Sequence, residues 1–350
     1  MTYSLPKLIE ILAVGKGLAL ATIVEAEGST PQVTGASAVF SAAGLVAGTV
    51  GGGLLEARVE SIAGQALRDG KARLATIRLD ADPADMEGAI CGGAARVLID
   101  PGVGRERAVF ELALDGFRKR RHGYFVAGIH PVEGDVVIVE RVWLPIDAPW
   151  DPEKRGLAGV VLGIDDMEAA SWPCLVKDEG RLAFIELVRP LPRLIIAGAG
   201  HVGRALARLG SLLDFSVTVI DDRPEFANAQ NVPEADEIIV GDIGDSVRDI
   251  EDSQDNYFVI VTRGHRKDAE ALQAAIRRPS AYLGMIGSKR KIEIMHGEFL
   301  ESGRAAAAEW DKVHAPIGIE IGSKTVEEIA VSIAAELVLV RSKRKESGRP

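Results

Sequence analysis

A glycine-rich turn between an apolar strand and a helix constrains the fold of this chain more than any other sequence feature. Residues 194–203 read LIIAGAGHVG, so that Gly198, Gly200 and Gly203 form a G-x-G-x-x-G pattern. In such a turn the first glycine allows a tight bend, the second lets the backbone approach a pyrophosphate, and the third lets the helix pack close to the sheet. The pattern predicts a Rossmann-like βαβ unit with a phosphate site where its helix begins.

An acidic residue follows the next predicted strand. The apolar residues 217–220 end in Asp221, about 20 residues beyond the turn, where a carboxylate can accept both hydroxyl groups of an adenosine ribose. His201 lies inside the turn, and Arg223 follows the acid. Asp221 favours an unphosphorylated ribose, whereas pairing of Arg223 with a 2′-phosphate would reverse that preference. Two interpretations are open: a pocket for NAD(P) or another dinucleotide, and a Rossmann-shaped domain whose pocket is unused.

The length of 350 residues is enough for two or three domains. Residues 189–192 read RPLP, which predicts a linker because two prolines stiffen an extended chain and block a helix. We therefore expect an N-terminal domain at 1–188 and a C-terminal domain at 193–341. In the second domain predicted strands alternate with helices, which indicates a doubly wound parallel sheet. The predicted strands are 194–197, 216–220, 237–240, 257–262 and 282–285, and a helix with a capping box of Thr325 and Glu328 follows them.

The first half mixes helices and strands without this alternation, so we expect a mixed α/β domain. The predicted helices are 5–14, 54–68 and 106–121. The predicted strands are 17–26, 36–41, 74–79, a strand from 91–93 to 101, a hairpin of 124–130 with 136–143, and 184–188. Residues 145–168 have little periodicity.

Composition excludes several classes of function. The formal net charge is −10, which argues against a nucleic-acid partner because such binding depends on neutralising phosphates. No run approaches about 18 apolar residues, so no membrane span is expected, and charges interrupt the N-terminal apolar pattern, unlike in a signal peptide. Only 2 cysteines are present, which fits a reducing, cytoplasmic location.

A second glycine cluster precedes the predicted helix 54–68. Gly51, Gly52 and Gly53 would expose several backbone N–H groups at the start of that helix, which suits an oxyanion or phosphate. Glu56, one turn later, either orients a polar ligand or caps the helix. The alternative for the whole cluster is a flexible turn between a strand and a helix.

Cys91 precedes Gly92 and Gly93. Free amides at two glycines would stabilise a thiolate, and the alternative is a buried, inert cysteine. Cys174 has no such surroundings and is expected to pack in the core.

Histidines and a basic segment follow other predicted strands. His201, His265 and His314 are expected near the carboxyl edge of the parallel sheet, where open α/β folds bind ligands. No spacing of His, Cys and Asp resembles a zinc site. The segment GSKRK at 287–291 either meets a phosphate or is a solvated helix start.

On these motifs the chain resembles the XdhC/CoxI family, the maturation factors of xanthine and carbon monoxide dehydrogenases. The motifs in the first half are GSTP at 28–31, GA at 35–36, GTVGGG at 48–53 with Glu56, and CGG at 91–93. Those in the second half are GAGHV at 198–202, VIDDR at 219–223, TRGH at 262–265 with Asp268, GMIGSKR at 284–290, PIGIEIG at 316–322 and EEIA at 327–330.

The resemblance implies a dimeric chaperone with a Rossmann-like second domain. It implies that the chain binds molybdenum cofactor (molybdopterin), helps it gain its terminal sulfido ligand with a cysteine desulfurase, and passes it to a molybdenum hydroxylase such as xanthine dehydrogenase. The chain departs from the family at Gln32, where an arginine is frequent, and at Leu54, where a cysteine is frequent. The second departure leaves Cys91 as the one thiol for a sulfur step.

The sequence therefore predicts a two-domain cofactor chaperone with no catalytic or metal-binding residues of its own. The predicted cofactor-binding residues are Gly51, Gly52, Gly53, Glu56, Cys91, Gly92, Gly93, Gly198, Gly200, His201, Gly203, Asp221 and His265. One alternative is an NAD(P)-dependent oxidoreductase with His265 or His314 near its substrate. Another is a nucleotide-sensing module that regulates a partner.

Overall fold

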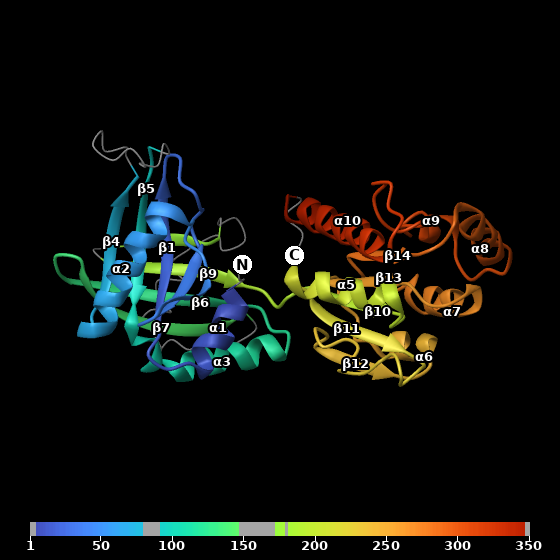
Figure 1. The fold of residues 1–350 in the computed structure, drawn as a ribbon, viewed down its shortest axis with the longest axis horizontal. Helices are drawn as coiled ribbons and strands as arrows, with labels where there is room; N and C mark the ends of the chain where they lie inside the picture. The colour runs from blue at the N-terminus through green and yellow to red at the C-terminus, as the bar shows by residue number, and fades with distance from the viewer. Residues whose placement is uncertain (1–4, 80–91, 147–171, 179–180, 347–350) are drawn as a thin grey trace. The chain divides into compact units, whose positions relative to one another are not determined.

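The chain divides into two compact units, Met1–Pro190 and Leu191–Pro350 (Figure 1). The computed structural model describes residues 5–79, 92–146, 172–178 and 181–346. Within that part, no helix is both long and apolar enough to cross a bilayer.

The first unit is built on one nine-stranded sheet of order β3-β2-β1-β5-β4-β7-β6-β9-β8, in which every neighbouring pair is antiparallel. The strands are β1 Ala19–Glu27, β2 Ser37–Ser41, β3 Gly44–Gly48, β4 Ala72–Arg78, β5 Ala94–Asp100, β6 Gly123–Glu133, β7 Val136–Pro145, β8 Cys174–Asp178 and β9 Arg181–Val188. The sheet curls so that β8 approaches β1, and Lys177 of β8 donates a hydrogen bond of 2.8 Å to Glu25 of β1.

Helices bury both faces of this curled sheet. They are α1 Leu5–Val14, α2 Gly53–Asp69, the 3₁₀ turn η1 Pro101–Gly104 and α3 Arg107–Arg118. Along β1, Ala21 and Ile23 pack in the cluster that holds α2, whereas Leu20 packs in the cluster of α1 and α3. Burial on both sides explains why the strand is almost continuously apolar instead of alternating. The helix α2 therefore packs on one face of the sheet, and α1 and α3 pack on the other.

The second unit has a five-stranded parallel sheet of order β12-β11-β10-β13-β14. The strands are β10 Arg193–Ala197, β11 Ser216–Asp221, β12 Glu237–Val240, β13 Asn256–Ile260 and β14 Tyr282–Met285. The helices are α5 His201–Leu212, α6 Ile243–Asp249, α7 His265–Ala275, α8 Lys289–Glu301, α9 Ala307–Trp310 and α10 Val326–Glu346.

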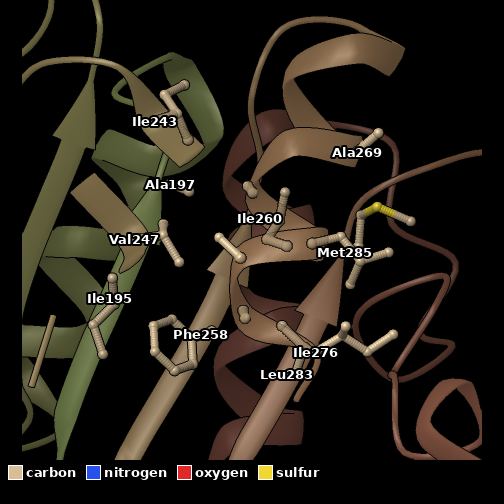
Figure 2. Close-up of a cluster of buried hydrophobic side chains, with 14 of the residues drawn as sticks. Ile195, Ala197, Ile243, Val247, Phe258, Ile260, Ala269, Ile276, Leu283 and Met285 are labelled. Carbon is tan, nitrogen blue, oxygen red and sulfur yellow. The ribbon is translucent and has the colours of Figure 1, made fainter. Parts of the chain in front are cut away.

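Helices cover both faces of this parallel sheet. Leu194 and Ile196 of β10 pack with α5 and α10, whereas Ile195 and Ala197 pack on the other side with α6 and α7. Figure 2 shows the second of these clusters, which includes Phe258, Ile260 and Met285. The unit is thus Rossmann-like and doubly wound, and its strand order reverses between β10 and β13.

The predicted fold class is confirmed, with local differences. The sequence prediction missed the short strands β3 and β8, and β3 has Leu45 and Val46 both exposed, so it lacks the alternation that marks a half-buried strand. The predicted helix 106–121 ends earlier, at Arg118, because Arg120 has a left-handed backbone with φ of 54°. The capping box is confirmed: the Thr325 hydroxyl accepts from the Glu328 N–H, and Glu328 accepts from the Thr325 N–H at 2.9 Å. Most of the aperiodic stretch 145–168 lies outside the described residues.

Candidate functional site

Three loops of the first unit meet at the start of α2. An isolated parallel bridge joins Ser29 to Gly92. A Cβ atom added at Gly93 would lie 2.4 Å from the carbonyl oxygen of Ser29, and one added at Gly51 would lie 2.8 Å from Cγ of Pro31. Only glycine allows these approaches. The structure therefore brings Gly51, Gly92 and Gly93 together around the loop that contains Ser29 and Pro31.

The triple-glycine loop, Gly51 to Gly53, has an unusual backbone. The three φ angles are 124°, 68° and 55°, all in the region that favours glycine. A Cβ atom at Gly52 or Gly53 would meet nothing within 4 Å, so this side of the loop is open. Gly52 is the N-cap of α2 and supplies no side-chain hydrogen bond. The first backbone N–H groups of this 17-residue helix therefore lie beside open space, and they form the positive end of the helix dipole.

Glu56 braces this loop from inside. Its Oε2 accepts hydrogen bonds from the Thr49 hydroxyl at 2.7 Å and from the Val50 N–H at 3.2 Å. The Thr49 hydroxyl oxygen in turn accepts from the Gly51 N–H at 3.0 Å. This carboxylate fixes the shape of the loop, and a direct contact of Glu56 with a ligand stays a prediction.

Of the two cysteines, the structure describes Cys174, whereas Cys91 lies outside the described residues. Cys174 lies in β8 opposite Ile185, and burial raises the pKa of its thiol. A raised pKa keeps this thiol protonated at neutral pH, which agrees with a packing role.

A basic groove that sequence reasoning missed lies between α2 and β4. Its volume is about 340 Å³, and it is lined by Arg58, Ser61, Ile62, Thr76, Ile77 and Arg78. Arg58 donates a hydrogen bond of 3.0 Å to the backbone carbonyl of Arg78. The next residue, Leu79, donates its N–H to the Gly93 carbonyl at 2.8 Å, so the groove adjoins the glycine loops. The two arginines are far apart in sequence, and no local motif marks them.

In the second unit the glycine turn follows β10 at the point where the strand order reverses. A Cβ atom at Gly198 would lie 2.5 Å from the Val261 carbonyl oxygen, and one at Gly203 would lie 1.8 Å from the Gly198 carbonyl oxygen. Packing therefore requires glycine at both positions. Gly200 has open space beside it, as a backbone that a ligand approaches must have.

Asp221 at the end of β11 is buried, and both of its carboxylate oxygens accept hydrogen bonds. One carboxylate oxygen accepts from the Ala199 N–H at 2.8 Å and from Nη2 of Arg223 at 2.9 Å. The other accepts from the Arg223 N–H at 3.0 Å and from its Nε at 2.8 Å. Burial opposes ionisation of Asp221, but the hydrogen bonds from Arg223 and Ala199 outweigh it and lower its pKa. Binding of ribose hydroxyls by Asp221 stays a prediction. In this structure Arg223 occupies the carboxylate acceptor sites that those hydroxyls would need.

His201 and His265 begin α5 and α7 at the carboxyl edge of the sheet. His201 Nδ1 lies 3.1 Å from the Arg204 guanidinium, and His265 Nε2 lies 2.9 Å from a Glu298 oxygen. His314 lies near the same edge, because it bridges to Gly284, one residue before the end of β14, and its carbonyl accepts from the Met285 N–H at 3.0 Å. Its Nδ1 is 2.8 Å from Glu336, which follows it by 22 residues and belongs to no recognisable motif.

A buried acid lies beneath the loop after β13. Asp268 is fully buried and accepts hydrogen bonds from the Thr262 hydroxyl at 2.6 Å and from the Lys291 ammonium. Burial raises the pKa of Asp268, and the bonds from Lys291 and Thr262 oppose that rise. Lys291, from the predicted basic segment, thus ties α8 to α7.

Family models match both units of the chain. The model of the XdhC and CoxI family matches residues 11–80, and that of the XdhC Rossmann domain matches residues 194–337. The triple-glycine loop lies in the first match, and the G-x-G-x-x-G turn with Asp221 lies in the second.

Relatives of known name extend over both units. The chain is 26% identical over 335 residues to a protein of Bacillus subtilis named as a probable subunit of xanthine dehydrogenase, covering 93% of each chain. It is 23% identical to the molybdenum cofactor insertion chaperone PaoD of Escherichia coli, covering 97% of this chain and 88% of PaoD. It is also 28% identical to an uncharacterized Escherichia coli protein, YqeB, but spans 43% of that protein's length. A crystal structure described as a xanthine dehydrogenase from Bacillus halodurans has a TM-score of 0.80 and 26% identity, covering 99% of this chain and 98% of the other.

Proposed function

Because the chain belongs to the XdhC and CoxI family, we propose that it is a maturation factor that binds molybdenum cofactor for a xanthine dehydrogenase-type hydroxylase. The names of relatives support this: one is a molybdenum cofactor insertion chaperone, and another is a probable subunit of xanthine dehydrogenase. The observation that carries the proposal is the meeting of three glycine loops at the start of α2, beside two arginines.

The residues of this site suit the phosphate of a molybdopterin. Backbone N–H groups at an uncapped helix start bind anions, and Gly52 leaves room for a ligand to reach them. Arg58 and Arg78 line the adjoining groove and add positive charge. Backbone donors and guanidinium groups are thus the protein's contribution on this side of the cofactor. We propose that the Cys91 thiol is a soft ligand to the molybdenum cofactor and that it takes part in the transfer of sulfur to the cofactor.

The chain's partners follow from this proposal. A cysteine desulfurase supplies sulfur for the terminal sulfido ligand of the cofactor, and the client hydroxylase receives the sulfurated cofactor. The chain acts as a homodimer that carries the cofactor and performs no turnover of its own. In the Rossmann-like unit, the open side of Gly200 and the start of α5 bind the pyrophosphate of a dinucleotide, either NAD(P) or a dinucleotide form of the cofactor.

Reconstitution of a client enzyme tests this function. Client hydroxylase is purified from cells that lack this chain, and is then incubated with cofactor, a cysteine desulfurase and cysteine, with and without the full chain. We expect hydroxylase activity to rise at least tenfold when wild-type chain is present. Cys91→Ala should lose most of that rise, whereas Cys174→Ala, which changes a thiol that packs in β8, should retain it. Equal client activity with and without the chain would contradict the proposed function, and full activity with Cys91→Ala would contradict the role of that thiol.

A further inference from the structure

We propose that Arg223 determines which nucleotide the Rossmann-like pocket accepts, by holding the acceptors of Asp221 and favouring a ligand whose ribose carries a phosphate. This inference rests on the proposed binding of a dinucleotide by this unit. It reverses the preference that Asp221 by itself would give, because the structure shows the carboxylate already paired.

The hydrogen-bonding capacity of Asp221 is used up. A carboxylate has about four lone-pair sites. In this structure Ala199 uses one site, and the backbone N–H, Nε and Nη2 of Arg223 use three. A ribose diol donates two hydrogen bonds, so it can reach Asp221 only after Arg223 has given up its own. An unphosphorylated ribose therefore has to compete with a charged group of the same chain.

Several contacts hold Arg223 in this place. Its Nε and Nη2 form a two-point contact with the carboxylate, the pairing for which the guanidinium shape is suited. Its guanidinium carbon lies 3.8 Å from the centroid of the Phe226 ring. The side chain is 18% exposed, so most of it is buried and a part of it reaches the surface. A competing diol would have to overcome the ion pair and the ring contact together.

The remaining guanidinium edge is suited to a phosphate. Within the described part of the chain, Nη1 of Arg223 donates no hydrogen bond, so its two N–H groups are left for a ligand. The neighbouring acid Asp222 lies 3.9 Å from Arg223 Nε and 3.6 Å from the Lys267 ammonium, so its charge is shared between two cations. A ribose 2′-phosphate would thus meet guanidinium donors and would not need the acceptors of Asp221.

Binding of NAD⁺ and NADP⁺ to the full chain, measured by isothermal titration calorimetry, tests this inference. The wild type should bind NADP⁺ at least tenfold more tightly than NAD⁺. Arg223→Ala should bind NAD⁺ at least tenfold more tightly than the wild type does, and should lose the preference for NADP⁺. Arg223→Lys keeps the charge without the two-point contact, so its affinity for NAD⁺ should lie between those of the wild type and Arg223→Ala. This variant replaces Arg223→Ala in the test if Arg223→Ala does not fold.

Arg341→Ala is the matched control. This arginine also lies over an aromatic ring, 4.7 Å from the centroid of Phe215, but it donates to the Leu213 carbonyl and makes no contact with Asp221. Its variant should keep the wild-type ratio of the two affinities. If the wild type prefers NAD⁺, or if Arg223→Ala binds NAD⁺ no more tightly than the wild type, the inference is wrong while the nucleotide pocket stands. If neither nucleotide binds the wild type or the Arg223 variants, the nucleotide pocket is wrong, and the inference falls with it.

Discussion

The two glycine-rich loops have similar compositions but need their glycines for different reasons. In the second unit, Gly198 and Gly203 are required because neighbouring carbonyl oxygens leave no room for a side chain. In the first unit, Gly52 and Gly53 have open space beside them and are required only by their left-handed backbone. The first loop thus leaves a surface uncovered at Gly52 and Gly53, whereas the second loop packs its helix tightly on the sheet and leaves open space at Gly200 alone of its three glycines. Substitutions should separate the two cases.

The largest expected effect is the loss of stability in Gly203→Ala. The added methyl group would lie 1.8 Å from the Gly198 carbonyl oxygen, which forces α5 away from the sheet. Overpacking of this kind costs about 3 kcal/mol. That cost lowers the melting temperature of the second unit by roughly 6–12 °C in differential scanning calorimetry. Gly200→Ala, with open space at its Cβ, is the control and should change stability by less than about 1 kcal/mol. Equal melting shifts in the two variants would show that Gly203 is not required for the packing of α5 on the sheet.

A smaller effect is expected for Asp221→Asn, which tests what fixes the second loop. The carboxylate holds both Ala199 in the glycine turn and Arg223, and loss of such charge-assisted bonds costs about 2 kcal/mol at neutral pH. The pKa of Asp221 in the folded chain is lower than in the unfolded chain, so its stabilisation is complete above about pH 4 and is lost as pH falls through the folded pKa. Urea unfolding of the wild type and variant should therefore differ at pH 7 and converge in acid. A difference that grows as pH falls would contradict this account.

Gly52→Ala should lower stability less than Gly203→Ala does. The methyl group meets no neighbouring atom, so the cost comes from placing a side chain at φ of 68° and ψ of −175°, a region that essentially only glycine adopts, and amounts to about 2 kcal/mol. Gly70, at the other end of α2, has open space as well but lies in the ordinary left-handed helical region, with φ of 69° and ψ of 17°, so Gly70→Ala should cost less, about 1 kcal/mol. Chemical denaturation of the full chain measures both. A cost for Gly52→Ala as large as that for Gly203→Ala would show that the first loop is packed after all.

The smallest effect is expected for Glu56→Gln. The amide oxygen can still accept from the Thr49 hydroxyl and the Val50 N–H, so only the charge of the acceptor is lost. We expect a loss of about 0.5–1 kcal/mol in unfolding free energy and faster hydrogen exchange at the N–H groups of Val50 and Gly51. Unchanged exchange there would show that Glu56 does not brace the loop.

The sequence predicts the parts of this molecule that local patterns encode. The G-x-G-x-x-G turn, the parallel strands and the capping box at Thr325 each depend on neighbouring residues, and the structure has them. The glycine clusters at Gly51 and Gly92 are recognisable in sequence, but their meeting through Ser29 is a tertiary contact that no spacing reveals.

The sequence does not predict which polar side chains pair with one another. Asp221 has the position of a ribose acceptor, but Arg223, two residues away, folds back onto it. Asp268 pairs with Lys291, and His314 pairs with Glu336, across separate helices and loops. The arginines of the α2–β4 groove come together only because helix and strand pack side by side. Such contacts depend on the completed fold, so the spacing of residues in the sequence does not predict them.

Direct binding of molybdopterin to the purified full chain tests the central claim, that the open glycine loop of the first unit holds the cofactor. The measurement compares wild type with Gly52→Val and Gly70→Val, which each place a side chain at a positive φ, at the two ends of the same helix. We predict saturable binding to the wild type, at least tenfold weaker binding to Gly52→Val, and wild-type affinity in Gly70→Val. Equal affinity of all three, with each shown to be folded, would contradict the account.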